Sequence, residues 1–354
     1  LTPRERYFAP NDALSQLRGG AWQLRIDGVD ELLVEHDSVM LEAANASFQV
    51  HFQTGPEEFA RLYNIALAVS GPVLAAAVNS PLMLGRRLWH ETRIAVFQQS
   101  IGTRQSIADM RELEPRVSFG RKWVDDSVLE IFKEDISRFK VLLGKAIDED
   151  PLSELASGRA PQLKALQLFN STVYRWNRAC YGVKDGVAHL RIENRVLPAG
   201  PTVLDEVANA AFWFGLVSAL ANEVDDVRDE IAFDAVRTNF VAAARHGIDA
   251  QLEWFGGRTW TAQDLILSQL IPVSERGLRA GGIDEDDISR YLETIQRRVE
   301  SRQTGAAWML GSLADMQDQG SPEERMAALV AATVSRQTDQ SPVHAWRRAT
   351  LTEA

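Results

Sequence analysis

The sequence predicts an α+β protein in which a curved antiparallel sheet has a polar concave face, helices cover the outside, and a helical layer forms the C-terminal part. Two strand-like segments and one change of periodicity support this class. Residues 46–53 and 188–197 each alternate between apolar and polar side chains, as half-buried strands do. After residue 225 nearly every segment shows helical periodicity instead. We therefore expect an α+β body at 1–225 and a helical subdomain at 226–354.

The composition excludes several classes of protein. The chain has 354 residues, 45% hydrophobic and 25% charged, which is ordinary for a soluble globular protein. Its net charge of −11 argues against a general nucleic-acid binder, because phosphate contacts need clustered lysine and arginine. Cys180 is the one cysteine, so no internal disulfide can form and a cytoplasmic location is expected. Because the sequence starts with leucine and shows no signal peptide, we expect a piece of a longer product or a processed one.

The first strand with a polar face is predicted at residues 46–53, after a shorter strand at 22–26. Gln49 and His51 lie on its polar face, and its apolar face consists of Phe48, Val50 and Phe52. This strand therefore has one side for a core and one side that offers ligands.

A broken helix should follow this strand. Thr54 is a good N-cap residue, and residues 62–85 form an uncharged run long enough for a membrane span. That run contains two prolines and several polar residues. We therefore predict a buried helix that breaks at Gly71-Pro72 and ends near residues 79–81, with no membrane as partner.

The middle of the chain is predicted to be mostly loop, apart from one amphipathic helix. That helix covers about 127–143, with Asp126 as its cap and one apolar stripe. A polar loop follows at 148–162, and residues 169–183 are predicted to be extended before a turn at 184–186.

The second strand with a polar face is the other arm of that hairpin, residues 188–197. Arg191, Glu193 and Arg195 share one face, with neighbours about 7 Å apart. Such a row can hold an anion and a cation side by side, such as a phosphate and its metal ion. An exposed strand face with self-paired charges is the alternative.

The remaining predicted elements are helices. One starts at the N-cap Thr202 and runs to about residue 222. The others cover 231–254, 261–280, 284–302, 304–317 and 322–336.

If the two polar strand faces lie in one sheet, His51 and Glu193 can share a metal ion. Mg²⁺ prefers oxygen ligands and keeps waters, and a neutral imidazole is better tolerated by Mn²⁺. Arg195, beside that carboxylate, could neutralise a phosphoryl group during transfer. Residues 176–178 could form the floor of a nucleotide or substrate pocket, but an aromatic turn packed against the sheet is the favoured interpretation. No pattern marks Cys180 as a nucleophile.

Four motifs, taken in order, resemble the glutamate–cysteine ligase family, which includes the carboxylate–amine ligases and has a glutamine-synthetase-like fold. They are Phe48-Gln49-Val50-His51-Phe52, Ala77-Val78-Asn79-Ser80-Pro81, Glu91-Thr92-Arg93 and Glu193-Asn194-Arg195. The resemblance covers about residues 1–225 and extends loosely to 302–308. It implies ATP- and Mg²⁺-dependent activation of a glutamate-like carboxylate to an acyl phosphate, which an amine such as cysteine attacks. The implied partners are small molecules: an amino acid, an amine and ATP.

The resemblance also implies roles for individual residues on the two strands. His51 and Glu193 match the family's ligands for Mg²⁺ or Mn²⁺, and Gln49 is a weaker candidate ligand. Glu193 and Arg195 match the catalytic pair, in which the arginine faces the phosphate.

Three further arginines are candidates for substrate binding. Arg93 matches the family's arginine that takes the carboxylate of the amino-acid substrate, although a surface salt bridge with Glu91 is the alternative. Arg104 and Arg191 are the other two candidates.

One feature of the family has no equivalent in this sequence. The family's first strand carries a Glu-x-Glu pair that binds the same metals, and it would precede residue 1; the acidic pair at 35–37 falls too late. The segment is expected to be either absent from this chain or lacking in the protein. In the second case the alternative is a catalytically incomplete binding or regulatory module. A guanidino-type phosphotransferase is a weaker alternative, and the sequence leaves open whether the chain forms a homo-oligomer.

Overall fold

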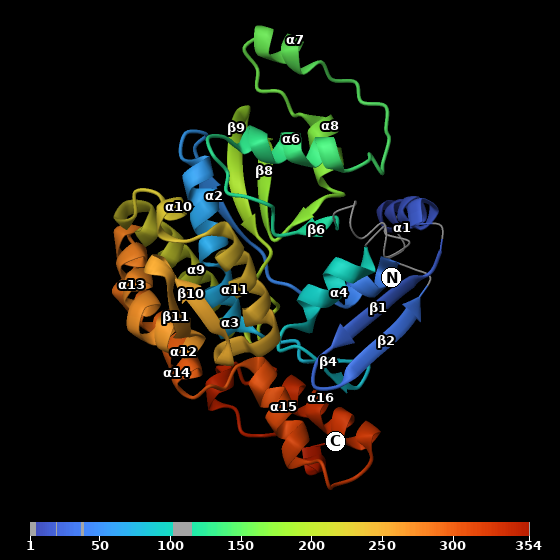
Figure 1. Ribbon diagram of the computed structural model, residues 1–354, viewed down its shortest axis with the longest axis vertical. Helices are drawn as coiled ribbons and strands as arrows, with labels where there is room; N and C mark the ends of the chain where they lie inside the picture. Colours follow the sequence, from blue (N-terminus) through green and yellow to red (C-terminus); the bar gives the residue numbers. More distant parts are fainter. Residues whose placement is uncertain (1–4, 19, 37–38, 102–114, 354) are drawn as a thin grey trace.

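The computed structural model describes residues 5–18, 20–36, 39–101 and 115–353 of the chain (Figure 1). They form a mixed assembly of helices and strands, as the sequence predicts, with a three-stranded antiparallel sheet beside a bundle of helices. The curvature of that sheet stays a prediction.

The central sheet has the strand order β3–β9–β8, formed by Val50–Thr54, Val187–Asn194 and Asn177–Lys184. Strands β8 and β9 form the predicted hairpin. Asp185 and Gly186 both have positive φ, 53° and 79°, as a two-residue type I′ turn requires. This turn sets the register of the whole hairpin.

The register places charged side chains in one row across the sheet. Arg178 of β8 lies opposite Glu193 of β9, and His51 of β3 lies opposite Glu193 from the other edge. Because paired residues in a sheet project from the same face, these three side chains must share one side.

Helices cover the opposite, apolar side of the sheet. Helix α2 (Phe59–Ala68) contacts β8 and β9 and continues, after a bend of 45°, into α3 (Ser70–Ala77). The predicted break exists, but it lies at Val69, and Gly71-Pro72 fall in the first turn of α3. Helix α2 begins at Phe59 rather than after Thr54, whose hydroxyl donates to Glu58. Helix α9 (Val203–Glu223) packs against both.

Two of these segments have the length and hydropathy that a bilayer crossing requires. They are α9 alone and the bent α2–α3 pair taken as one span. Within the protein, however, 61% of the apolar window of α9 is buried, as are all of α3 and nearly all of α2. Helices at the centre of a folded core show the same pattern.

Helices α11 (Phe233–His246), α13 (Ile271–Ala280) and α14 (Glu285–Glu300) complete the bundle around α3 and α9. Helices α9 and α13 approach each other through two glycines. A Cβ atom on Gly277 would lie 1.8 Å from the carbonyl oxygen of Gly215, so any larger residue there would separate the helices.

The predicted helix at 231–254 is wrong from residue 247 onward. Helix α11 ends at His246, where Gly247 takes a φ of 54°, and Gln251–Trp254 (β10) pairs with Arg258–Thr261 (β11). The side-chain amide of Asn239 bonds both backbone groups of Glu253, at 2.6 and 2.9 Å, and so holds the strand. A four-residue alternation is too short to be distinguished from a helix by periodicity.

Several helices lie where the sequence predicted loop or extended chain. They are α4 (Thr92–Ser100), α7 (Pro151–Ala156) and α8 (Lys164–Asn170). The predicted helix at 127–143 is α6 (Val128–Arg138), and its cap is Ser127 with a capping box to Glu130 rather than Asp126.

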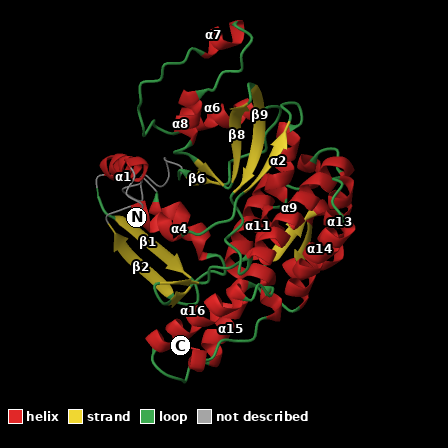
Figure 2. Cartoon of the chain, turned by 180° about the vertical axis from the view of Figure 1, so that it is seen from behind, coloured by secondary structure: helices red, strands yellow, loops and turns green. Residues whose placement is uncertain are grey.

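The other elements are short or lie at the ends of the chain. They are α1 (Glu5–Arg18), β1 (Trp22–Asp27), β2 (Glu31–His36), η1 (Val39–Ala44), β4 (Leu82–Met83), β5 (Arg86–Arg87), β6 (Val117–Ser118), β7 (Tyr174–Arg175), α10 (Val227–Glu230), η2 (Gly247–Asp249), η3 (Phe255–Gly257), α12 (Ala262–Leu265), η4 (Ile266–Leu270), α15 (Gly305–Asp315), α16 (Pro322–Thr338), η5 (Val343–Ala345) and η6 (Leu351–Glu353). Helices α15 and α16 lie together at the C-terminal end of the molecule (Figure 2).

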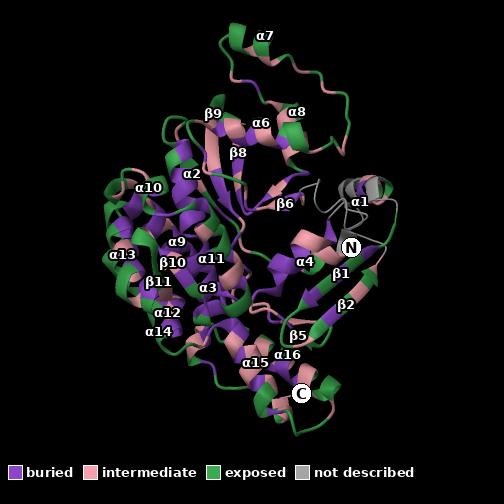
Figure 3. Ribbon diagram, in the orientation of Figure 1, coloured by how far each residue is buried: buried purple, intermediate pink, exposed green. Residues whose placement is uncertain are grey.

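One hydrophobic core joins most of the molecule. It extends from Leu14 to Ala306 and fills the space among α2, α3, α9 and α11, where Figure 3 shows buried residues. A second cluster around Trp308 and Trp346 holds α15 and α16. The main core continues across residue 225, and the division of the chain at that point stays a prediction.

Candidate active site on the central sheet

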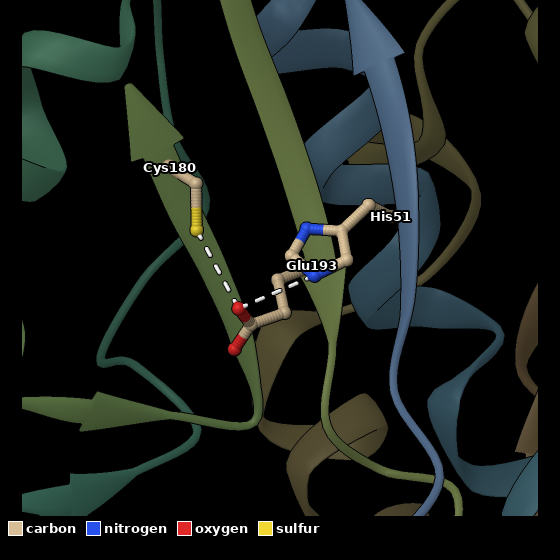
Figure 4. Close-up of side chains that lie close together, drawn as sticks. All are labelled: His51, Cys180 and Glu193. Carbon is tan, nitrogen blue, oxygen red and sulfur yellow. Dashed lines mark hydrogen bonds and ion pairs between the residues drawn. The ribbon is translucent and has the colours of Figure 1, made fainter. Parts of the chain in front are cut away.

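Side chains from all three strands of the central sheet meet on one face (Figure 4). His51 Nε2 lies 3.6 Å from Glu193 Oε2, and Cys180 Sγ lies 3.7 Å from the same oxygen. Glu193 is 3% exposed, whereas the His51 side chain is 35% exposed. The carboxylate is therefore buried beneath a partly exposed imidazole.

Arginines surround the Glu193 carboxylate and exceed its charge. Arg178 Nη2 lies 2.8 Å from Oε2, and Arg195 Nε lies 2.6 Å from Oε1. Arg191 projects from the same face of β9, two residues away. Among the residues described, Nε of Arg178, Nε of Arg191 and Nη1 of Arg195 are buried without a hydrogen-bond acceptor. Buried guanidinium N–H groups in positive excess suit an anionic ligand such as a phosphate.

Burial and charge set the protonation states of this group. Burial lowers the pKa of His51, and the neighbouring arginines lower it further against the opposing effect of Glu193. Burial alone would raise the pKa of Glu193, but Arg195 and Arg178 outweigh it and hold that pKa below its usual value. Burial raises the pKa of the Cys180 thiol. At neutral pH the site therefore presents a carboxylate, a neutral imidazole and a neutral thiol.

Neither Arg178 nor Cys180 was predicted as a site residue, although residues 176–178 were considered for the floor of a nucleotide or substrate pocket. The signal for both was in the hairpin: a two-residue turn at 185–186 places Arg178 opposite Glu193, and the period of two places Cys180 on the same face. Trp176, which is 1% exposed, packs into the core as the predicted aromatic turn would. Arg178 instead extends toward the carboxylate.

Arg93 is buried rather than open to solvent. It is 4% exposed; its Nε donates to Glu91 Oε1 at 2.9 Å, and its other nitrogens donate to the backbone carbonyls of residues 195–196. Glu91 also accepts hydrogen bonds of 2.8 Å from the turn at residues 79–80. The pair considered as a surface salt bridge is therefore a buried one that ties this turn to the end of β9.

Arg93 also lines a cavity of about 270 Å³, together with Asn45, Asn79 and Met309. Asn45 Nδ2 and Asn79 Oδ1 are buried and have no hydrogen-bond partner among the described residues. A donor and an acceptor left unpaired near a buried arginine suit the charged groups of an amino acid. The role of Arg93 in binding a substrate carboxylate stays a prediction.

Two of the predicted site residues are not among the side chains that meet on the central sheet. Gln49 precedes the first residue of β3 and is exposed, and Arg104 lies outside the described residues. The roles predicted for them, and those predicted for the residues gathered on the sheet, stay predictions.

A larger cavity of about 560 Å³ lies between α2, α6 and residues 119–124, and none of the sheet residues above lines it. Its buried Arg175 is paired with Asp135 at 2.6 Å, and its Lys122 with Asp125 at 2.6 Å. The central sheet is the stronger candidate site, because its arginines also have buried N–H groups without an acceptor among the described residues.

A sheet face that gathers an imidazole, a carboxylate and three guanidinium groups is typical of proteins that hold a divalent cation beside an anionic group. The sequence matches glutamate-cysteine ligase family 2 over residues 1–332, and the chain belongs to that family. The resemblance seen in the four motifs is thereby confirmed. No curated protein sequence matches the chain.

Two solved structures show a distant likeness. A glutamate–cysteine ligase (gshA) from Francisella tularensis, in complex with AMP, matches with a TM-score of 0.40 and 14% identity over 80% of this chain and 62% of that one. The Pup ligase PafA of the prokaryotic ubiquitin-like modification pathway, in complex with ADP, matches with a TM-score of 0.35 and 9% identity over 89% and 57%. The chain thus spans less than two thirds of either protein. The family assignment rests on the sequence match.

Proposed function

We propose that this chain forms the catalytic face of an ATP- and Mg²⁺-dependent ligase that joins the carboxylate of an acid to an amine. Glutamate is the proposed acid and cysteine the proposed amine, as the family's name suggests. One observation carries the proposal: His51, Glu193 and Arg178 are paired across three strands, and Arg195 contacts the same carboxylate. Ligands for a cation and for an anion are thus adjacent.

The donor set fits a divalent metal and phosphate groups. Glu193 and His51 would hold Mg²⁺ or Mn²⁺, and oxygens of the nucleotide and water would supply the remaining ligands. The unpaired N–H groups of Arg178, Arg191 and Arg195 would donate to phosphate oxygens. A metal bound there supplies charge neutralisation for the phosphates.

In the proposed reaction a carboxylate oxygen of the acid attacks the γ-phosphorus of ATP, which gives an acyl phosphate and ADP. The amine nitrogen then bonds to the acyl carbon, the carbon–oxygen bond to phosphate breaks, and the amine proton leaves to solvent. Arg195 and Arg178 neutralise charge on the transferred group, so the protein contributes mainly positioning and electrostatics. The cytoplasm, where Cys180 stays reduced, is the proposed location.

The test is ADP formation by the longest protein that contains this chain, given ATP, Mg²⁺, glutamate and a panel of amines. We expect amine-dependent turnover in the wild type and a loss of about 100-fold in Glu193→Gln, which keeps the shape but removes the charge. Glu285→Gln, an exposed residue in α14, is the matched control and should retain activity. Absence of amine-dependent ADP from the wild type, or full activity in Glu193→Gln, refutes the proposal.

A catalytically incomplete binding module is the second candidate function. Arg178 and Arg195 already neutralise the carboxylate of Glu193, so this face of the sheet needs no metal ion to balance its charge. Titration calorimetry with ATP, with and without Mg²⁺, separates the two candidates. Nucleotide binding that never leads to turnover with any amine favours the module, and turnover excludes it.

A further inference from the structure

Cys180 gives the sheet face a metal-binding atom of a different chemical type. One donor atom each from His51, Cys180 and Glu193 lie within 4.8 Å of one another. Figure 4 shows the imidazole and the thiol directed at the same carboxylate oxygen from the two outer strands. Cys180 and Glu193 are 7% and 3% exposed, so two of the three donors are already withdrawn from water.

The separations suit a tetrahedral zinc ion. Zinc binds sulfur at about 2.3 Å and nitrogen or oxygen at about 2.0–2.1 Å, so adjacent donors in a tetrahedron lie about 3.3–3.6 Å apart. The observed distances from the carboxylate oxygen are 3.6 Å to His51 and 3.7 Å to Cys180. The imidazole and the thiol must approach each other by at most about 1.3 Å to complete the geometry.

We propose that His51, Cys180 and Glu193 form a three-ligand site for Zn²⁺ or a similarly soft divalent cation. A thiolate selects zinc over magnesium, because magnesium prefers oxygen donors throughout. On binding, the S–H bond of Cys180 breaks, a sulfur–zinc bond forms, and the proton leaves to solvent without any change of oxidation state. Three protein ligands leave the fourth position of the ion open to water or a ligand.

Arg178 opposes this site. Its Nη2 lies 2.8 Å from the Glu193 oxygen that the thiol also contacts, so zinc must displace this hydrogen bond. Arg195 holds the other carboxylate oxygen and keeps Glu193 in place when that bond is lost. Zinc affinity should therefore fall when Cys180 is removed and rise when Arg178 is removed.

The test uses Co²⁺ as a coloured substitute for Zn²⁺ and records the absorption spectrum of this 354-residue chain without nucleotide. The chain has one cysteine, so a thiolate-to-cobalt charge-transfer band can come only from Cys180. We expect this band, with the intense visible bands of tetrahedral cobalt, and its loss when one equivalent of Zn²⁺ is added.

Three variants complete the test. In Cys180→Ser the band should vanish, and zinc affinity measured by competition should fall by about 10–100-fold or more. Loss of a residue that only hydrogen-bonds to a metal ligand already lowers affinity by about that factor. Arg178→Gln should bind zinc more tightly. His246→Gln, an exposed histidine elsewhere, should match the wild type. Absence of the band in the wild type, or equal zinc affinity in wild type and Cys180→Ser, overturns the proposal.

A consequence for catalysis rests on the proposed function. Zinc in this site would occupy Glu193 and His51 and inhibit the ligase, and inhibition should be weaker in Cys180→Ser. Because the cobalt spectrum needs no turnover, a spectrum without ligase activity refutes only the proposed function. Ligase activity without the thiolate band refutes only the zinc site.

Discussion

The buried pair of Arg93 and Glu91 offers the sharpest test of how this site is supported. Arg93→Met removes the guanidinium but keeps most of the side-chain volume. It leaves Glu91, which is fully buried, without its cation, and it leaves the carbonyls of residues 195–196 without their donor. The affected backbone carries Arg195, so both stability and the position of that arginine depend on this contact.

The expected loss of stability follows from burial. Breaking a buried ion pair by removal of one partner costs about 3–5 kcal/mol, because an unpaired charge remains in the interior. The side chains of Arg93 and Glu91 are 4% and 0% exposed, so this case applies fully. Arg87 and Asp30 form a pair of the same 2.9 Å length, but their side chains are 49% and 25% exposed. Arg87→Met should therefore cost at most about 1 kcal/mol.

The assay is equilibrium unfolding in urea for the wild type, Arg93→Met, Arg87→Met and the double variant Glu91→Gln/Arg93→Met. The double variant should recover part of the loss, because it removes the unpaired charge. A free energy of unfolding for Arg93→Met within about 1 kcal/mol of that for Arg87→Met would refute the reasoning. A raised KM for the acid with unchanged stability would instead support the predicted contact with substrate.

Two further outcomes are expected. Gly277→Ala should lower the free energy of unfolding in urea by about 3 kcal/mol or more, because its Cβ would meet the carbonyl oxygen of Gly215 at 1.8 Å. The control Gly144→Ala, whose Cβ would have nothing within 4 Å, should leave that free energy unchanged. Equal stabilities of the two variants would contradict the close packing of α9 and α13. Burial raises the pKa of Tyr63 from 10.0 to about 12, so the folded state holds its proton to higher pH than the unfolded state does. The free energy of unfolding should therefore fall by about 2 kcal/mol as pH rises from 10 to 12. Tyr63→Phe, which loses the hydrogen bond to Asn177 O, should start less stable but lack this slope; an unchanged slope would show that another group titrates.

The sequence was most informative where structure is local. The helix around α9 was predicted within a residue of its ends, because Thr202 caps it and its apolar pattern is long. The sequence was least informative for β10 and β11, because a four-residue alternation is too short to be distinguished from a helix. Strand β10 is held by Asn239 of α11, whose side chain bonds the backbone of Glu253. The sequence was equally uninformative for α4, which begins at Thr92 in an arginine-rich segment with no clear helical periodicity.

By itself the sequence determined which side chains share a strand face, because that depends only on the period of two. His51 on one strand and Glu193 on another, each with an apolar opposite side, and the four ordered motifs of the family could therefore be read directly. Only the tertiary structure decided that these two residues stand opposite each other, since the register between strands some 140 residues apart is set by packing. It also decided that Arg93 is buried against Glu91 and that Cys180 joins the carboxylate, because burial and diagonal contacts arise from neighbours that no local pattern specifies.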